Sequence, residues 1–272
     1  MDLIRSAADG DTESVLRLVA EGADVNQLNP VTGLTALHAA AMYGHHSVAH
    51  ILLDSGAVVD RKGGSRCLLT PLWLAAAARH ADVISLLLDS GASTETRDEA
   101  GFTPLIVASK EGFDGVVEQF LAHGADVGAR IANGATALHF VAMQKGRLQI
   151  AGLLLRHGAD VQTTDDAGFT PLHGAAKYDL SDLVSLLLQH SADPNSPDND
   201  RRTPLHYAAA AGADAAVRLL LAAGANRNAR DIEGSRPMDS AKAFGEDATA
   251  RLLRPPSWIS AFFSWLLSLW KQ

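Results

Sequence analysis

Cysteine is almost absent from this chain. Cys67 is the only cysteine in 272 residues, so an intramolecular disulfide is excluded. A basic excess is also missing: the formal net charge is −8 at pH 7, whereas nucleic-acid-binding proteins usually show a basic balance or stripe. The opening stretch MDLIRSAADGD contains no apolar core of the length that a signal peptide needs. These absences predict a cytoplasmic protein that is not secreted and has no nucleic-acid partner.

Sequence motifs that carry catalysis are missing too. The chain contains no G-x-x-x-x-G-K-[ST], G-x-S-x-G or H-E-x-x-H pattern. His46 and His50, in the stretch AMYGHHSVAH, do have the i, i+4 spacing of two metal ligands on one helix face. We interpret them as residues of a helical turn. We therefore expect no enzyme, no cofactor and no bound metal.

What the chain does have is an internal repeat of about 33 residues. The stretch GFTPLIVASKEG at 101–112 returns as GFTPLHGAAKYD at 168–179. Aligning on this phrase gives six full units and two atypical ends, which is the pattern expected when terminal repeats must face water. The eight units start near residues 1, 35, 70, 103, 136, 170, 203 and 236.

The residue pattern of each repeat predicts two short helices and a turn. Threonine followed by proline suits a helix N-cap and first helical position. A second, leucine-rich helix such as DVISLLLDSGA follows, and a glycine past its end favours a left-handed backbone. Loops rich in Asp, Asn and Gly then turn back to the next threonine. Helices this short are marginal alone, so each pair must be packed between its neighbours.

The T-P-L-H-x-A phrase and the GAD-V-N ending resemble ankyrin repeats over residues 1–254. The resemblance implies an all-α solenoid with short β-hairpin loops between the units. It also implies protein–protein recognition as the activity. We therefore predict a non-catalytic adaptor, and the alternative is a substrate-recognition subunit of a ubiquitin ligase or another multi-protein complex.

Histidines recur at fixed places in the units. One group occupies the third position of the first helix, where a side chain can reach back to the cap as in a capping box. A second group precedes the Gly or Ser after the second helix, where a partly charged imidazole suits the helix end. Since Ile106 and Trp73 replace the first kind in two units, we predict a structural role for these positions. The two groups are His38, His139, His173 and His206, and His123, His157 and His190.

The ankyrin resemblance implies partner binding on the hairpin tips and on the concave face made by the first helices. Exposed aromatic and basic side chains are typical of interface hot spots. Basic residues recur along this face and favour an acidic peptide partner, and the alternative is that they are ordinary solvated surface positions. The candidate partner-binding residues are Tyr43, His45, Arg79, His80, Lys110, Glu111, Phe113, Lys145, Arg147, Lys177, Tyr178 and Tyr207.

The segment 255–272 differs from the repeats, because it is hydrophobic and rich in tryptophan. Its serines fall at helical spacing and predict a helix with one narrow polar stripe. At about 1.5 Å per residue, its charge-free part is too short to cross the roughly 30 Å hydrocarbon core of a bilayer. We predict that it covers the last repeat, binds a partner, or makes peripheral contact with the cytosolic face of a membrane. The residues predicted to make this contact are Trp258, Phe262, Trp265, Leu269 and Trp270.

Overall fold

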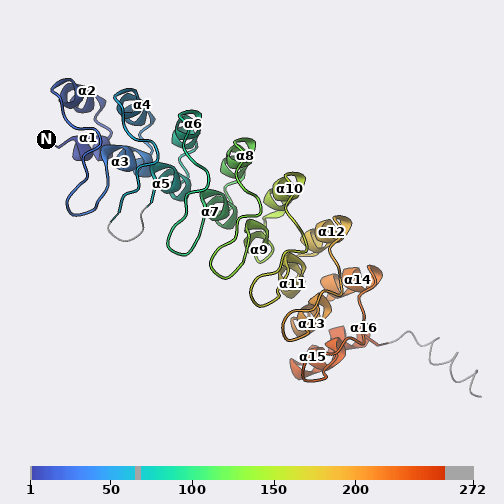
Figure 1. Ribbon diagram of the computed structural model, residues 1–272. Helices are drawn as coiled ribbons and strands as arrows, with labels where there is room; N and C mark the ends of the chain where they lie inside the picture. Colours follow the sequence, from blue (N-terminus) through green and yellow to red (C-terminus); the bar gives the residue numbers. More distant parts are fainter. Residues whose placement is uncertain (1, 65–68, 255–272) are drawn as a thin grey trace, which may run out of the picture. The chain divides into compact units, whose positions relative to one another are not determined.

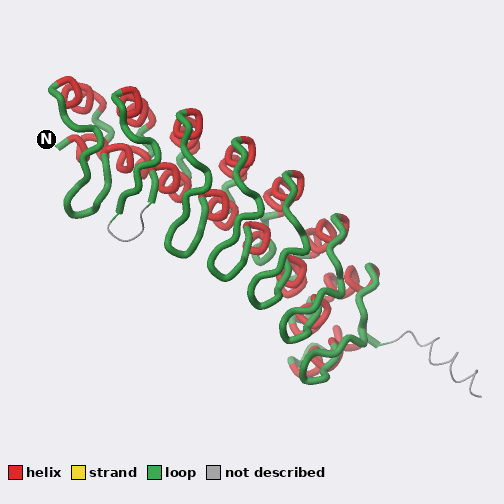
Figure 2. Tube along the Cα trace, in the orientation of Figure 1, coloured by secondary structure: helices red, strands yellow, loops and turns green. Residues whose placement is uncertain are grey.

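The computed structural model describes residues 2–64 and 69–254 (Figure 1). This described part is built from α-helices joined by turns, and it contains no named strand (Figure 2). An isolated antiparallel bridge joins Gly63 to Leu69. The predicted C-terminal helix and its residues Trp258, Phe262, Trp265, Leu269 and Trp270 lie outside the described residues. The all-α repeat solenoid is confirmed.

Contacts divide the chain into two compact units. Unit 1 comprises residues 1–141 and 146–160, and unit 2 comprises residues 142–145 and 161–272. The helices of unit 1 are α1 (Leu3–Asp9), α2 (Thr12–Ala20), α3 (Ala36–Tyr43), α4 (His46–Asp54), α5 (Pro71–Ala78), α6 (Ala81–Asp89), α7 (Pro104–Glu111), α8 (Asp114–Ala122), α9 (Ala137–Val141) and α10 (Leu148–Arg156). The helices of unit 2 are α11 (Pro171–Lys177), α12 (Ser181–Gln189), α13 (Pro204–Ala210), α14 (Asp214–Ala222), α15 (Pro237–Ala243) and α16 (Asp247–Leu252).

Within each unit the first helices of successive repeats pack side by side, and so do the second helices (Figure 1). The first helices are short and rich in alanine, which lets neighbouring backbones approach closely. The second helices bury one leucine or valine face between the two rows, as Leu52, Leu87 and Leu187 do. No single helix pair encloses a core, so each repeat depends on burial against its neighbours.

The first helices begin as the threonine–proline phrase predicts. Thr70 and Thr103 are extended N-caps whose hydroxyls accept the backbone N–H of the third helical residue, at 3.3 Å in each case. The proline that follows stands where its missing N–H needs no partner. This local chemistry fixes where each repeat restarts.

The histidines at the third helical position complete the caps. In His38, His139, His173 and His206 the imidazole Nδ1 accepts the N-cap backbone N–H at 3.0–3.2 Å. A neutral imidazole that accepts through Nδ1 carries its proton on Nε2. In three of them, Nε2 donates to the carbonyl just before the next repeat's N-cap, at Leu69, Arg202 and Ser235 respectively. One side chain therefore closes a helix and ties it to the following repeat, which agrees with the predicted structural role.

The two replacements of this histidine behave differently. Trp73 is half-buried, and its indole N–H donates to the carbonyl oxygen of Phe102 at 3.3 Å, the bond that histidine Nε2 makes elsewhere. Ile106 is fully buried and keeps only the packing. The tie between repeats thus survives one replacement and is lost in the other.

The loops between repeats are held by aspartates rather than by strands. Asp98, Asp165, Asp198 and Asp231 each accept backbone N–H groups two and four residues ahead at 2.8–3.0 Å. Two backbone bonds close each of these loops, for example Asp165 N–H to the carbonyl of Phe169 at 3.0 Å and Gly168 N–H to the carbonyl of Asp165 at 2.9 Å. Both bonds involve the same aspartate and do not extend into a ladder, so the expected β-hairpins are turns in the described chain.

Two repeats depart from the common pattern. Helix α9 covers five residues because a turn containing the inserted Lys145–Gly146 follows it early. In the last repeat, Asp239 stands in the histidine position and accepts the Arg236 backbone N–H at 3.1 Å. The same carboxylate pairs with the Arg236 guanidinium at 3.0 Å, so an ion pair replaces the Thr–His pair.

Candidate functional site

The predicted partner-binding residues lie at the C-terminal ends of the first helices and in the turns that follow them, except Tyr207, which lies in the middle of α13. Unit 1 holds Tyr43, His45, Arg79, His80, Lys110, Glu111, Phe113 and Arg147, and unit 2 holds Lys145, Lys177, Tyr178 and Tyr207. The exposed members are Tyr43, Arg79, Lys110, Glu111, Lys145, Lys177 and Tyr178. Eight members of the predicted set therefore belong to unit 1 and four to unit 2.

Three members of the set are occupied in joining adjacent repeats. His45 and His80 bond through Nε2 to the carbonyls of Ala8 and Met42 in the preceding repeat, at 2.9 and 3.1 Å. Arg147 donates to the Glu111 carbonyl at 3.1 Å. Each side chain lies against a glycine of the preceding turn, where a Cβ would collide with it. These three side chains have a structural use in addition to any binding role.

Two aromatic rings of unit 1 lie close to cations, and one of them, Phe113, belongs to the predicted set. The Arg79 guanidinium lies 5.1 Å from the Phe113 ring centre, and the Lys110 ammonium lies 5.9 Å from that of Phe102. Lys110 also pairs with Glu111 at 3.3 Å. A shallow hollow of about 300 Å³ opens here, lined by Trp73, Ala77, Asp98, Phe102, Val107, Lys110 and Glu111.

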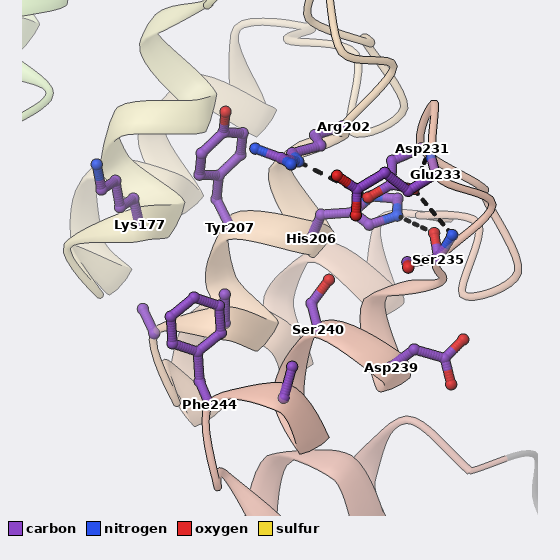
Figure 3. A pocket seen from close by; sticks show the side chains of 13 residues that line it. Lys177, Arg202, His206, Tyr207, Asp231, Glu233, Ser235, Asp239, Ser240 and Phe244 are labelled. Carbon is purple, nitrogen blue, oxygen red and sulfur yellow. Dashed lines mark hydrogen bonds and ion pairs between the residues drawn. The ribbon is translucent and has the colours of Figure 1, made fainter.

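A larger hollow, of about 480 Å³, lies in unit 2 between α13 and α15 (Figure 3). Aromatic side chains and alanine methyl groups form one part of its wall, and charged and hydroxyl groups form the other. Only Lys177 and Tyr207 of its lining belong to the predicted set. The lining comprises Lys177, Arg202, His206, Tyr207, Ala210, Ala211, Asp231, Glu233, Ser235, Asp239, Ser240, Ala243 and Phe244.

Tyr207 is held firmly in the wall of this hollow. Its hydroxyl donates to the carboxylate of buried Asp198 at 2.6 Å. Its ring meets Phe169 edge to face at 5.2 Å and His173 at 5.6 Å. Burial and the bond to Asp198 raise the pKa of Tyr207 to about 12, so the phenol stays protonated at neutral pH. The Tyr207 side chain is therefore a fixed, uncharged part of the wall of the hollow.

The polar side of the hollow is a network of paired groups. The Arg202 guanidinium lies between Asp200 at 3.5 Å and buried Asp231 at 3.7 Å. His206 donates through Nε2 to the Ser235 carbonyl at 3.1 Å, and burial lowers the pKa of this imidazole. Figure 3 shows Asp231 and Ser235 on the side of the hollow away from Lys177. Arg202, Asp231 and His206 are therefore structural members that shape the hollow.

These contacts give the hollow no arrangement for acid–base or nucleophilic catalysis. The imidazole of His206 is committed at both nitrogens, and the described lining places no hydroxyl against a free base. No group of three or more metal-ligating side chains occurs within residues 2–64 and 69–254. A fixed aromatic wall beside charged groups is instead suited to holding a side chain of a partner.

Comparison with known proteins assigns the chain to a family. A family model described as ankyrin repeats (3 copies) matches residues 3–98, 64–131, 105–198, 138–231 and 181–257. The chain belongs to the ankyrin-repeat family. Ankyrin repeats are protein–protein interaction modules, and the family is generally non-catalytic.

The curated relatives match this ankyrin-repeat chain over part of their length. Neurogenic locus notch homolog protein 1 of Xenopus tropicalis is 34% identical over 168 residues, which cover 60% of this chain and 6% of the relative. Ankyrin repeat domain-containing protein 40 of Mus musculus is 47% identical over 55 residues, 20% of this chain and 15% of the relative. An L-asparaginase of Dirofilaria immitis is 30% identical over 184 residues, 67% of this chain and 30% of the relative. This chain spans less than a third of each of these three proteins.

Sequence reasoning missed several contacts of this ankyrin-repeat chain. His50 pairs with Asp54 at 2.8 Å, and His45 turns away to the preceding repeat, so the three neighbouring histidines do not converge. The sequence did not point to Phe244 and Glu233 as members of the hollow, because they lie in the last repeat and its loop, where the repeat pattern is weakest.

Among the helices of the described residues, none has the length and apolar character needed to cross a bilayer.

Proposed function

We propose that this ankyrin-repeat chain is a non-catalytic adaptor of the cytoplasm that binds a partner protein through its first helices and the adjoining loops. The hollow between α13 and α15 carries the proposal, because it combines a fixed tyrosine, an exposed phenylalanine and unlike charges on a repeat surface. Aromatic and charged groups of this kind are where binding energy concentrates in protein interfaces.

The exposed lysines test this function. Reversing Lys110, Lys145 and Lys177 together to Glu should abolish affinity capture of the partner while leaving the helical circular dichroism signal unchanged. All three side chains are exposed, and surface substitutions usually change the free energy of unfolding by no more than about 0.5 kcal/mol. The matched control reverses Arg156, Arg218 and Arg251, which are exposed on the second helices α10, α14 and α16.

Capture should be judged by quantitative mass spectrometry of the same bait with and without each set of changes. Proteins lost with the lysine set but retained with the arginine control are partners of the first-helix surface. Equal capture by the lysine variant and the parent would place binding on the loop tips instead.

We further propose that residues 255–272 bring the adaptor to the cytosolic face of a membrane. Support comes from the sequence, since tryptophan is favoured at membrane interfaces and Lys271 can meet lipid headgroups. Deleting residues 256–272 should abolish sedimentation with phosphatidylcholine–phosphatidylserine vesicles and leave the melting temperature unchanged. No vesicle binding by the full chain, together with a large drop in melting temperature on deletion, would assign the segment to covering the last repeat.

A further inference from the structure

We propose that the hollow between α13 and α15 is a directional peptide subsite, which takes one large apolar side chain of a partner flanked by an acidic and a basic residue. The acidic residue meets Lys177 and the basic residue meets Glu233. This inference rests on the proposed adaptor function and specifies the chemistry of the partner.

The apolar centre of the subsite is preorganised. Tyr207 is fixed by its 2.6 Å bond to Asp198 and by edge-to-face packing on Phe169. Opposite it, Phe244 leaves 71% of its surface exposed at the end of α15. Methyl groups of Ala210, Ala211 and Ala243 also line the hollow. At about 480 Å³, the hollow has the size of a small-ligand pocket, which is ample for one large side chain. A wall that is already fixed loses little entropy when a ligand binds.

The charges of the lining lie at opposite ends. Figure 3 places Lys177 beside Tyr207 on one side and Glu233 beyond Arg202 on the other. Lys177 is exposed, and its ammonium contacts only the Tyr178 ring, at 5.6 Å from the ring centre, among the interactions of the described residues. Glu233 is also exposed, and its carboxylate takes part in no ion pair or side-chain hydrogen bond with residues 2–64 or 69–254.

The other charged groups of the lining are paired. Arg202 lies between Asp200 and Asp231, which keeps one excess negative charge at the Glu233 end, and Asp239 pairs with Arg236 at 3.0 Å. Lys177 is therefore the unpaired positive charge at one end, and Glu233 adds to the negative charge at the other. Unlike charges at the two ends favour one orientation of a bound peptide, because the reverse orientation would place like charges together.

A displayed library of random decapeptides, selected on the full chain, tests the subsite. The expected ligands carry an acidic and a basic residue on opposite sides of one large apolar residue, in the same order in every selected peptide. Fluorescence anisotropy with a selected peptide should show about tenfold weaker binding or more to Phe244→Ala. The matched control is Ile232→Ala, which truncates an apolar side chain that is 58% exposed and outside the hollow.

Reversing the charges of Lys177 and Glu233 tests the subsite more specifically than the loss of Phe244. Selection on Lys177→Glu should replace the acidic residue of the peptides by a basic one, and selection on Glu233→Lys should do the opposite at the other end. Arg218→Glu, an exposed change on α14, should leave the selected sequences unchanged.

Three results would overturn the subsite. Selected peptides that bind equally to the parent, Phe244→Ala and both charge variants would place recognition elsewhere, while leaving the adaptor function intact. Failure to select any peptide on the parent would count against both proposals. A dimer of the full chain that Phe244→Ala separates into monomers would show that a second copy fills the hollow.

Discussion

Single residues with a left-handed backbone end the second helices of this protein. Gly91 and Gly124 have φ of +84° and +76°, as their recurrence in the sequence predicts. Nothing lies within 4 Å of where their Cβ atoms would be, so glycine is needed there for its backbone freedom and not for space. Ser191 occupies the equivalent place in unit 2 with φ of +67°, where an L-residue pays a conformational cost of about 1–2 kcal/mol.

Replacing Ser191 by glycine should therefore stabilise the protein. We expect Ser191→Gly to raise the free energy of unfolding by about 0.5–1 kcal/mol, since relief of backbone strain exceeds the added entropy of the unfolded chain. The backbone carbonyl of Ser191, which accepts from Gln162 at 3.1 Å, is kept in the variant. Urea unfolding measures the change. Ala223→Gly, one residue before a left-handed glycine and with φ of −81°, should destabilise instead, and equal effects of the two changes would contradict the argument.

At the scale of the helix, the first-helix caps couple stability to pH. His38, His173 and His206 are neutral, because Nδ1 accepts a backbone N–H and Nε2 donates to a carbonyl. Burial lowers the pKa of each of these imidazoles below the ordinary value of 6.5. Below pH 6.5 the unfolded chain therefore binds more protons than the folded chain, and the stability of the fold decreases as the pH falls toward the folded pKa.

Removing one of these histidines should flatten the pH dependence. In His206→Gln, glutamine keeps a side-chain acceptor at the third helical position and does not titrate. Between pH 7.5 and 5.5, which lies above the ordinary range of carboxylates, the variant should lose less unfolding free energy than the parent. The difference is at most about 1.4 kcal/mol for each pH unit. Urea titrations at three pH values measure it, with exposed His157→Gln as control. An unchanged slope in His206→Gln would show that this imidazole is not held neutral.

The sequence predicted what local chemistry determines. The repeat pattern correctly placed the threonine–proline caps, the third-position histidines and the left-handed glycines. Each of these features depends on residues within one repeat. The loops were predicted less well: an aspartate two and four residues before backbone N–H groups closes each turn without forming strands. The hollow beside Tyr207 was found only in part, because Phe244, Asp231 and Glu233 reach it from another repeat and repeat alignment gives no side-chain direction.

At the scale of the whole molecule, stability is distributed among repeats. The first helices from α1 to α13 each bury a leucine near their start, such as Leu72 in α5 and Leu205 in α13, and both of these are fully buried. In a repeat array each repeat contacts only the repeats next to it, so a local defect weakens the nearest interfaces first. Contacts divide this chain into unit 1 and unit 2, and we expect each to respond to a defect as its own cooperative unit.

Truncating one leucine in each unit tests this expectation. Leu205→Ala and Leu72→Ala should each lower the local free energy of unfolding by about 2–5 kcal/mol, from lost burial and the cavity left behind. Native-state hydrogen exchange followed by mass spectrometry locates the effect. Leu205→Ala should reduce amide protection across α11–α16 and leave α3–α8 protected, and Leu72→Ala should do the reverse. If either change reduced protection equally in both sets of helices, the two units would unfold together and the contact boundary would have no energetic meaning.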